Sequence, residues 1–458
     1  MRITVTSKEN LAKVLEENGY APELRCGGQG TCGRCAVQLI SGVWLVEGSI
    51  IRTPFRALSC RSSLLSDSGE VEFEPAPRAG NIVMDWNLMP LPARTETVIG
   101  VDIGTTTVAA VKINRGKVVS RASCFNAQNR YGDNIITRIS QSAANLSGLQ
   151  AAVHESIRNV LDELGLENIA RIAIAGNTVM TCLFHGIDPS SIGVMPFSPP
   201  QRLFPTSAWQ GIPLLTMPCI AGCVGGDLTA GLSAVSLRAG EMLVDIGTNC
   251  EIIFNTEQGM FCTAAAAGPA FEGAGLHFGC RATTGAIDHY RGISDYSVIG
   301  GGRVLGFCGS GYIDFLAVER CKGHLNEFGR YEPPAKQMQI ADDVFVHEYD
   351  IEQLLKAKAA VWAGIKTLED HCAQQARTIY LAGGFTQHLN IENAVAIGML
   401  PERNYKTVGN ASLYGAASLA VTPEMLPKLE YLIDQPREIP LNVLPEFEDN
   451  FIDGLLLP

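Results

Sequence analysis

A duplicated five-residue sequence, VDIGT, constrains the fold of this chain more than any other feature. Its two copies begin at Val101 and Val244, within the longer segments VIGVDIGTTTVAAVKI and EMLVDIGTNCEIIF. The interval between them has the size of a small domain and is too long for the period of a solenoid repeat. In each copy an apolar strand runs into a turn of glycine and small polar residues. The sequence therefore predicts a duplicated α/β unit.

Each copy is followed by an amphipathic helix and then by an apolar strand that ends in small residues. The expected helices are residues 151–164 and 351–372, and the strands after them read RIAIAGNT and TIYLAGGF. Apolar residues recur on one face of both helices, as they do in helices that cover a sheet. We therefore expect two similar lobes that face a cleft. The predicted first half is about 97–240, the second half is about 241–420, and a tail follows at 421–458.

Residues 1–75 follow a different pattern, in which short alternating strands surround one amphipathic helix. The expected strands are residues 2–6, 34–39 and 70–73, and the expected helix is residues 10–17. A proline-rich stretch at residues 76–96 blocks regular structure and is predicted to be a linker. A chain of 458 residues ordinarily folds around more than one core. The predicted fold class is a small α+β domain followed, from residue 97, by the duplicated α/β unit.

The charge and hydropathy of the chain exclude several classes of protein. A formal net charge of -12 argues against sequence-independent nucleic-acid binding, which needs an excess of Lys and Arg. No run of about eighteen or more apolar residues is present, and the amino-terminal segment carries acids in place of the apolar core of a signal peptide. We therefore expect a cytoplasmic protein that binds neither nucleic acid nor a membrane.

Four cysteines have the spacing of metal ligands. The segment CGGQGTCGRC supplies Cys26, Cys32 and Cys35, and Cys60 follows in ALSCRSS. This C-x5-C-x2-C spacing with a distant fourth cysteine differs by one residue from the plant-type pattern of [2Fe–2S] proteins. The glycines between the cysteines allow a tight loop whose N–H groups can point at the sulfurs. We interpret the four thiols as ligands of a [2Fe–2S] cluster; a four-cysteine zinc site and plain structural thiols are the alternatives.

Both VDIGT turns have the residue types of a phosphate-binding site. Backbone N–H groups and hydroxyls of such turns can surround phosphate oxygens, and the acids before them, Asp102 and Asp245, would face Mg²⁺ or its waters. Two later glycine pairs extend the site, although LAGGF could simply turn a strand into a helix and GSGYID could simply pack a helix. The predicted ATP-binding residues are Gly104, Thr105, Thr106, Thr107, Gly247, Thr248, Asn249, Gly309, Gly311, Gly383 and Gly384.

Two further carboxylates lie in glycine-rich segments, Asp227 in VGGDLTAGL and Glu272 in GPAFEGAG. Either could orient the water that attacks ATP, and together with Asp102 and Asp245 they form the predicted catalytic set. The alternatives are a helix N-cap for Asp227 and a solvated loop residue for Glu272.

Taken in their order, these motifs make the chain resemble the reductive activators of corrinoid proteins. The resemblance rests on CGGQGTCGRC with Cys60, VDIGTTT, IAGNT, GGDLTAG, LVDIGTN, GPAFEGA, GSGYID, LAGGF and LPEFEDNFIDGLLLP. It implies a β-grasp [2Fe–2S] ferredoxin domain at residues 1–75 and an actin/Hsp70/sugar-kinase-type (ASKHA) ATPase domain at residues 97–458. It also implies a homodimer that uses ATP, Mg²⁺ and an external low-potential electron donor. The implied activity is reduction of an inactive Co(II) corrinoid protein of a methyltransferase system to Co(I).

Three other functions stay open at this point. An ATP-driven electron donor to another low-potential acceptor would share the actin fold, as the activators of acyl-CoA dehydratases do. A redox-sensing ATPase would use the cluster to gate partner binding without delivering electrons. A sugar kinase would leave the cysteine-rich domain unexplained.

Overall fold

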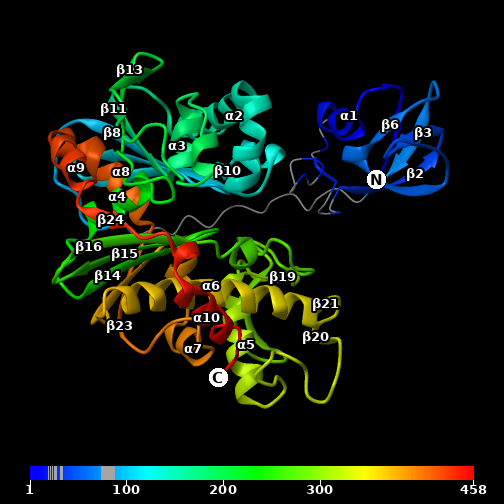
Figure 1. Ribbon diagram of the computed structural model, residues 1–458. Coiled ribbons are helices and arrows are strands. Elements are labelled where there is room, and N and C mark those ends of the chain that lie inside the picture. Colours follow the sequence, from blue (N-terminus) through cyan, green and yellow to red (C-terminus); the bar gives the residue numbers. More distant parts are fainter. Residues whose placement is uncertain are drawn as a thin grey trace.

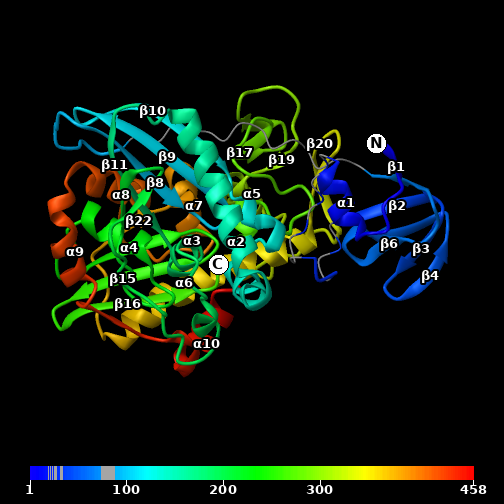
Figure 2. The same cartoon turned by 90° about the horizontal axis from the view of Figure 1, so that it is seen from above.

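The computed structural model describes residues 1–18, 20, 22, 24, 28–30, 33, 35–73 and 88–458 (Figure 1). Within these ranges the chain forms a small N-terminal unit and a larger unit of two lobes, which the two views in Figures 1 and 2 both show side by side. No described helix is both long and apolar enough to cross a membrane.

The N-terminal unit combines two small antiparallel sheets with one helix. Its elements are β1 (Arg2–Val5), α1 (Leu11–Glu17), β2 (Ala36–Ser41), β3 (Val43–Val46), β4 (Ser49–Arg52), β5 (Phe55–Leu58), β6 (Ser62–Leu64) and β7 (Gly69–Glu72). The strand orders are β1-β7-β2-β5 and β4-β3-β6. Asn10 caps α1 by accepting a hydrogen bond from the Ala12 N–H, and the apolar face of the helix packs on Leu39 and Trp44, which are fully buried.

The first lobe is built on a six-stranded sheet in the order β10-β9-β8-β11-β13-β12. Its strands are β8 (Thr97–Ile103), β9 (Thr107–Asn114), β10 (Lys117–Phe125), β11 (Ile169–Gly176), β12 (Ser207–Trp209) and β13 (Ile212–Thr216). The helices α2 (Ile135–Leu164) and α3 (Thr178–Phe184) cover one face of this sheet with an aliphatic core.

The second lobe is built on a six-stranded sheet in the order β23-β22-β14-β15-β16-β24. Its strands are β14 (Glu241–Ile246), β15 (Cys250–Thr256), β16 (Gly259–Ala265), β22 (Thr378–Ala382), β23 (Asn404–Gly409) and β24 (Pro436–Glu438). The long helix α6 (Glu348–His371) and helix α5 (Gly309–Cys321) pack against it in the largest core cluster of the described residues.

Additional elements surround the second lobe and join the two lobes. They are α4 (Gly226–Ala234), β17 (Ala286–Gly292), β18 (Asp295–Val298), β19 (Gly306–Phe307), β20 (Gln337–Ala341), β21 (Val344–His347), α7 (Ile391–Ala396), α8 (Ala411–Val421), α9 (Leu426–Leu432) and α10 (Pro445–Asp453). Although α8 follows β23 of the second lobe, it packs on β8 of the first lobe. A Cβ at Gly100 would lie only 2.6 Å from the Ala417 nitrogen, so glycine lets this helix approach the sheet closely.

The duplication predicted from the sequence is confirmed by strand pairing. In the first lobe β8 pairs antiparallel with β9 and parallel with β11; in the second, β14 pairs antiparallel with β15 and parallel with β22. The two VDIGT segments therefore end equivalent strands of two similar sheets. The prediction of an α+β ferredoxin-like unit followed by a duplicated, actin-like α/β unit is confirmed.

Element boundaries differ from the sequence-based expectation mainly in one helix. The helix expected at residues 151–164 begins at Ile135, and its backbone is non-helical at Asn145 (φ -134°, ψ 28°), where two helical stretches join. The polar and small residues around this kink carry no clear apolar periodicity, so the pattern shows only the second stretch.

Candidate functional site

A cleft of about 630 Å³ lies between the two lobes. Most of the residues predicted to bind ATP or to act in catalysis line it, namely Asp102, Gly104, Thr105, Thr106, Thr107, Asp227, Asp245, Gly247, Thr248, Asn249, Glu272, Gly309, Gly383 and Gly384. Gly311 does not line the cleft. A Cβ at Gly311 would lie 2.3 Å from the Ile287 carbonyl oxygen, so this glycine allows α5 to pack on β17.

The two VDIGT turns are tight hairpins that face each other across the cleft. The Gly104 N–H donates to the Thr107 carbonyl at 3.0 Å, and the Gly247 N–H donates to the Asn249 carbonyl at 2.8 Å. A Cβ at Gly104 would lie only 2.6 Å from the Thr107 carbonyl oxygen, so a residue with a side chain would not fit at this position of the turn. Such turns present backbone N–H groups and hydroxyls to an anion.

A buried arginine, Arg138, which was not predicted from the sequence, hydrogen-bonds to the backbone of the first turn. Arg138 is fully buried in α2 and donates to the Thr105 carbonyl at 2.6 Å and to the Asn129 side chain at 2.8 Å. Burial lowers the pKa of Arg138 to about 9, which leaves it protonated at neutral pH. It therefore fixes the turn and places a positive charge behind it. No local motif marks this residue, because the turn that it contacts lies 33 residues earlier in the chain.

The acids of the cleft lie close together and are partly or fully buried. Burial, together with the charges of Asp227 and Asp102, raises the pKa of Asp245 to about 8. Burial raises the pKa of Asp227 to about 7, opposed by the Leu228 N–H, which donates to it at 2.8 Å. Glu251, opposite Asp245 in the β14–β15 pairing, has a pKa raised well above its usual value by burial. A cation in this cleft would favour the ionised forms.

Asp102 differs from its counterpart Asp245 because two polar side chains hold it. Asn410 donates to one carboxylate oxygen at 2.9 Å and Ser412 to the other at 2.7 Å, both from the start of α8. Burial raises the pKa of Asp102, and these two hydrogen bonds oppose the rise. No sequence pattern points to Asn410 and Ser412, because they lie about three hundred residues from Asp102 in the chain.

The other two carboxylates of the predicted catalytic set, Asp227 and Glu272, take different positions. Gly225 is the N-cap of α4, and Asp227 lies in the first turn of that helix, where a negative charge is favourable. Glu272 is half-buried and accepts hydrogen bonds from Thr106 of one turn at 2.5 Å and from Thr248 of the other at 2.7 Å. Glu272 therefore contacts both lobes and is not a solvated loop residue.

A third glycine turn closes the cleft beside the second hairpin. Gly383 has a positive φ of 99°, and a Cβ there would lie 2.7 Å from the Ile246 carbonyl oxygen. A Cβ at Gly384 would meet nothing within 4 Å, so this position leaves open space along the cleft. Phe385 stacks on Phe271 with ring centroids 4.9 Å apart, giving the cleft an apolar wall. This combination of a glycine backbone and an aromatic wall suits a flat base.

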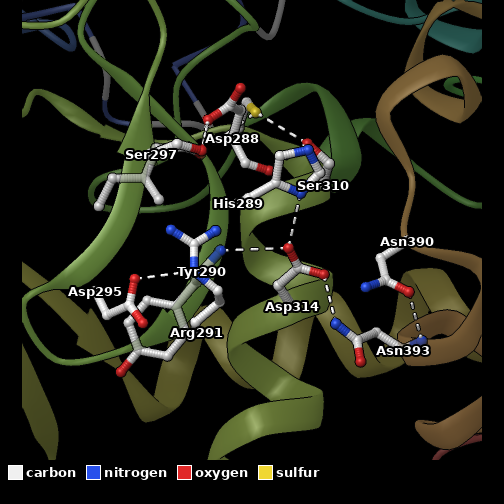
Figure 3. A network of polar contacts seen from close by, with 12 residues as sticks. Asp288, His289, Tyr290, Arg291, Asp295, Ser297, Ser310, Asp314, Asn390 and Asn393 are labelled. Carbon is white, nitrogen blue, oxygen red and sulfur yellow. Dashed lines mark hydrogen bonds and ion pairs between the residues drawn. The ribbon is translucent and has the colours of Figure 1, made fainter.

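A polar network joins β17, α5 and α7 (Figure 3). Asp314 of α5 accepts hydrogen bonds from His289 at 3.0 Å and from Asn393 at 2.6 Å, and thereby ties β17 and α7 to α5. Ser310 donates to the Asp288 carbonyl at 2.8 Å, and Ser297 donates to the Asp288 carboxylate at 2.5 Å. Asp288 and Ser310 line the cleft, so the network fixes the part of the cleft wall that β17 and α5 form.

No group of three or more His, Cys, Asp or Glu side chains in the described residues lies close enough together to hold a metal ion directly.

In the N-terminal unit, two of the four predicted cluster ligands converge. The sulfurs of Cys35 and Cys60 lie 3.3 Å apart, and both residues are buried. The Ser59 N–H donates to the Cys35 carbonyl at 2.9 Å, and the Asn10 side chain donates to the Cys60 carbonyl at 2.9 Å. Cys26 and Cys32 lie outside the described residues.

The described part of the cysteine loop packs closely on the segment after Cys60. Gly28 and Gly30 have positive φ values of 79° and 76°. A Cβ at Gly30 would lie 2.7 Å from the Arg61 Nε, and a Cβ at Gly28 would lie 3.8 Å from the Cys60 Cβ. Two converging buried thiols under a glycine-containing loop fit a cluster held by cysteines.

Family models match three stretches of the chain. The model of the 2Fe-2S iron-sulfur cluster binding domain matches residues 1–65. The model of the RACo middle region matches residues 97–239, and that of the C-terminal domain of RACo, the ASKHA domain, matches residues 240–458.

Relatives agree with these matches. The corrinoid activation enzyme RamQ of Eubacterium limosum is 27% identical over 403 residues, which cover 76% of this chain and 68% of RamQ. A Co(II) methylated amine-specific corrinoid protein reductase of Methanosarcina barkeri is 24% identical over 314 residues, 58% of each chain.

A solved structure has the same overall fold. The reductive activator for corrinoid, iron-sulfur protein superposes with a TM-score of 0.72 at 24% identity, covering 100% of this chain and 96% of that one. Together with the iron-sulfur domain match and the two consecutive RACo matches, this places the chain in the RACo family of reductive activators, with an N-terminal ferredoxin-type domain and an ASKHA ATPase domain.

Proposed function

We propose that this chain is an ATP-dependent reductive activase, which returns the inactive Co(II) corrinoid of a methyltransferase corrinoid protein to Co(I). The observation that carries the proposal is the presence, in one chain, of paired buried thiols and a cleft with two facing phosphate turns. The names of two relatives, a corrinoid activation enzyme and a Co(II) corrinoid protein reductase, support the choice of acceptor.

We assign Cys26, Cys32, Cys35 and Cys60 as the ligands of a [2Fe–2S] cluster. When bound, such a cluster supplies one electron at low potential. The chain's own contribution, in the part that the structure describes, is the close approach of Cys35 and Cys60 and the burial that shields both from water. The electron would come from an external low-potential donor protein. The domain limits that we propose are 1–75 for this domain, 76–96 for the linker and 97–458 for the ATPase domain.

We assign the interlobe cleft to ATP with Mg²⁺. The turns at residues 104–107 and 247–249 would surround the phosphates from opposite lobes, and the Gly383–Gly384 turn would accept the base and ribose. Asp102 and Asp245 would hold waters of the cation, with Asp102 kept in position by Asn410 and Ser412. Asp227 and Glu272 are the candidates for orienting the attacking water.

The two halves of the activity would be coupled through the population of lobe conformations. A nucleotide that contacts both turns binds a closed arrangement of the lobes more tightly than an open one, so it shifts the equilibrium toward closure. If the closed form binds the corrinoid protein in a state that accepts an electron more readily, ATP favours reduction. For a one-electron couple, about 59 mV corresponds to a factor of ten in equilibrium.

The test is anaerobic reduction of a Co(II) corrinoid protein. Dithionite-reduced protein is mixed with the corrinoid protein, and Co(I) is followed by its absorbance with and without Mg-ATP. The proposal expects Co(I) only when Mg-ATP is present. Equal Co(I) in both samples would contradict it, and no Co(I) with several corrinoid partners, despite an intact cluster and ATP binding, would favour another acceptor.

We also propose that the protein acts in the cytoplasm as a homodimer and binds neither nucleic acid nor a membrane. The resemblance to the corrinoid activators supports the dimer, and the negative net charge supports the absence of nucleic acid. Light scattering on the purified protein would give about twice the mass of one chain for a dimer, and the mass of one chain would contradict it.

A further inference from the structure

Glu272 contacts the same two turns that would bind the nucleotide phosphates. One carboxylate oxygen accepts from Thr106 Oγ1 at 2.5 Å, and the other accepts from Thr248 Oγ1 at 2.7 Å. Thr106 belongs to the first lobe, and Thr248 and Glu272 belong to the second. A single carboxylate thus connects the two lobes across the cleft.

The segment that carries Glu272 reaches the first lobe at a second point. Arg281 lies over the ring of Phe125, with its guanidinium carbon 4.0 Å from the ring centroid. Phe125 ends β10 and pairs with Thr107, the last residue of the first phosphate turn. Both contacts of this segment with the first lobe are therefore beside the same turn.

The two contacts belong to one folded unit. Gly273 follows Glu272 with a positive φ of 74°, and a Cβ there would lie 2.4 Å from the Cys280 carbonyl oxygen. The backbone after Glu272 therefore lies directly against the backbone before Arg281. We call residues 268–283 the clasp segment, because a displacement of Glu272 would be transmitted through this contact to Arg281.

The hydrogen bonds of Glu272 and those of a phosphate exclude each other. A threonine hydroxyl has one hydrogen to donate, and in this structure Thr106 and Thr248 both donate it to Glu272. A phosphate oxygen that takes either donor must displace the carboxylate. An ionised carboxylate at these positions would also repel the phosphates, since both carry negative charge.

We propose that Glu272 occupies the phosphate-donor positions while the cleft is empty and competes with the nucleotide phosphates for them. Its displacement then releases the hold of the clasp segment on the first phosphate turn at Thr106. This inference rests on the proposed assignment of the cleft to ATP. The phosphates of a nucleotide would displace Glu272, and a base without phosphates would not. The clasp segment, which contacts both lobes, would therefore respond to the phosphates and not to the base.

The test compares the affinity for Mg-AMPPNP, an ATP analogue that resists hydrolysis, in matched variants of the full chain. Isothermal titration would be run on the unmodified protein and on Glu272→Ala, Glu272→Gln and Glu352→Ala, which removes an exposed acid of α6 outside the cleft. Because a charge-assisted pair of hydrogen bonds no longer competes, Glu272→Ala should bind Mg-AMPPNP about tenfold more tightly. Glu272→Gln should show a smaller gain, and Glu352→Ala should show none. Adenosine, which lacks phosphates, should bind all four proteins equally.

A second measurement needs no substitution. Hydrogen exchange of residues 268–283 in the unmodified protein should change when Mg-AMPPNP is added and should not change with adenosine. Unchanged or weaker Mg-AMPPNP binding by Glu272→Ala, or a clasp segment that does not respond to bound Mg-AMPPNP, would overturn the inference and leave the ATP site intact. Failure of the unmodified protein and of every variant to bind Mg-AMPPNP would overturn the ATP assignment, and this inference with it.

Discussion

At the scale of single residues, the two aspartates of the repeat begin as equivalents and end in different surroundings. Asp102 is held by Asn410 and Ser412, whereas the neighbours that act on Asp245 are the carboxylates Asp227 and Asp102. The first is positioned by neutral donors, and the second is kept protonated by its environment. Duplication thus supplies two acids with different hydrogen-bond partners and different charged neighbours.

Asp245 gives a pH-dependent prediction. Its pKa is about 8 in the folded protein against 3.8 as its ordinary value, so the folded state holds a proton that the unfolded chain releases. Without cation or nucleotide, the stability of the folded protein should therefore fall as the pH rises from about 5 to about 8. Asp245→Asn should flatten this fall and raise Tm at pH 8 by a few degrees.

Thermal unfolding in EDTA at about pH 5, 6.5 and 8 would measure the effect. Asp342→Asn changes an exposed aspartate in the turn between β20 and β21, so it should keep the slope of the unmodified protein. An unchanged slope in Asp245→Asn would show that this carboxyl is ionised in the empty cleft.

Alanine substitutions at two glycines of the cleft should have different effects, one on the stability of the fold and the other on nucleotide binding. A Cβ at Gly309 would lie 2.2 Å from the Phe271 carbonyl oxygen, so Gly309→Ala forces a backbone shift and should destabilise the protein by about 1–3 kcal/mol. A Cβ at Gly384 meets open space. Gly384→Ala should therefore keep the Tm and weaken the binding of Mg-AMPPNP.

Denaturant unfolding and isothermal titration on both variants would check this pair. The assignment of the Gly383–Gly384 turn to the base and ribose would be wrong if Gly384→Ala bound Mg-AMPPNP as tightly as the unmodified protein.

At the scale of elements, the long helix α6 anchors the C-terminal residues through a buried lysine. Lys358 is fully buried and donates to the carbonyls of Gly454 at 2.6 Å and Leu456 at 2.7 Å. Burial lowers the pKa of Lys358 to about 7. Its hydrogen bonds satisfy carbonyls that follow α10, which packs along α6 (Figure 1).

Lys358→Met keeps the length of the side chain and removes its donors. The buried carbonyls then lose their partner, so the free energy of unfolding should fall by about 1–3 kcal/mol. Residues 445–458 should also exchange amide hydrogens faster. Lys356→Met removes an exposed lysine of the same helix, which pairs with Glu352, and should change the unfolding free energy by less than about 0.5 kcal/mol. Equal exchange in the two variants would contradict the anchoring role.

Element patterns in the sequence predicted the parts of the site that are local in the chain. The VDIGT strands and turns carry their own apolar pattern and glycines, so the duplication and the facing turns followed from them. The contacts of Asp102 with Asn410, of Arg138 with the first turn and of Glu272 with Thr106 are made between distant segments. No local period encodes these contacts, because only the packing of α8, α2 and the clasp segment brings them about.

At the scale of the whole molecule, the N-terminal unit and the first lobe meet through an ion pair. Glu16 of α1 lies 3.5 Å from Arg130, which also pairs with Glu155 at 2.7 Å. Exposed pairs of this kind contribute roughly 0–1 kcal/mol, so this contact does not lock the two units together.

The central claim is that one chain joins a cysteine-held cluster to an ATP site. The most direct measurement follows ATP hydrolysis and Co(I) formation together in the unmodified protein, in Cys60→Ser and in Cys321→Ser, which changes an exposed cysteine of α5. The account predicts that Cys60→Ser hydrolyses ATP but forms no Co(I), while Cys321→Ser does both. Co(I) formation by Cys60→Ser at the rate of the unmodified protein would contradict it.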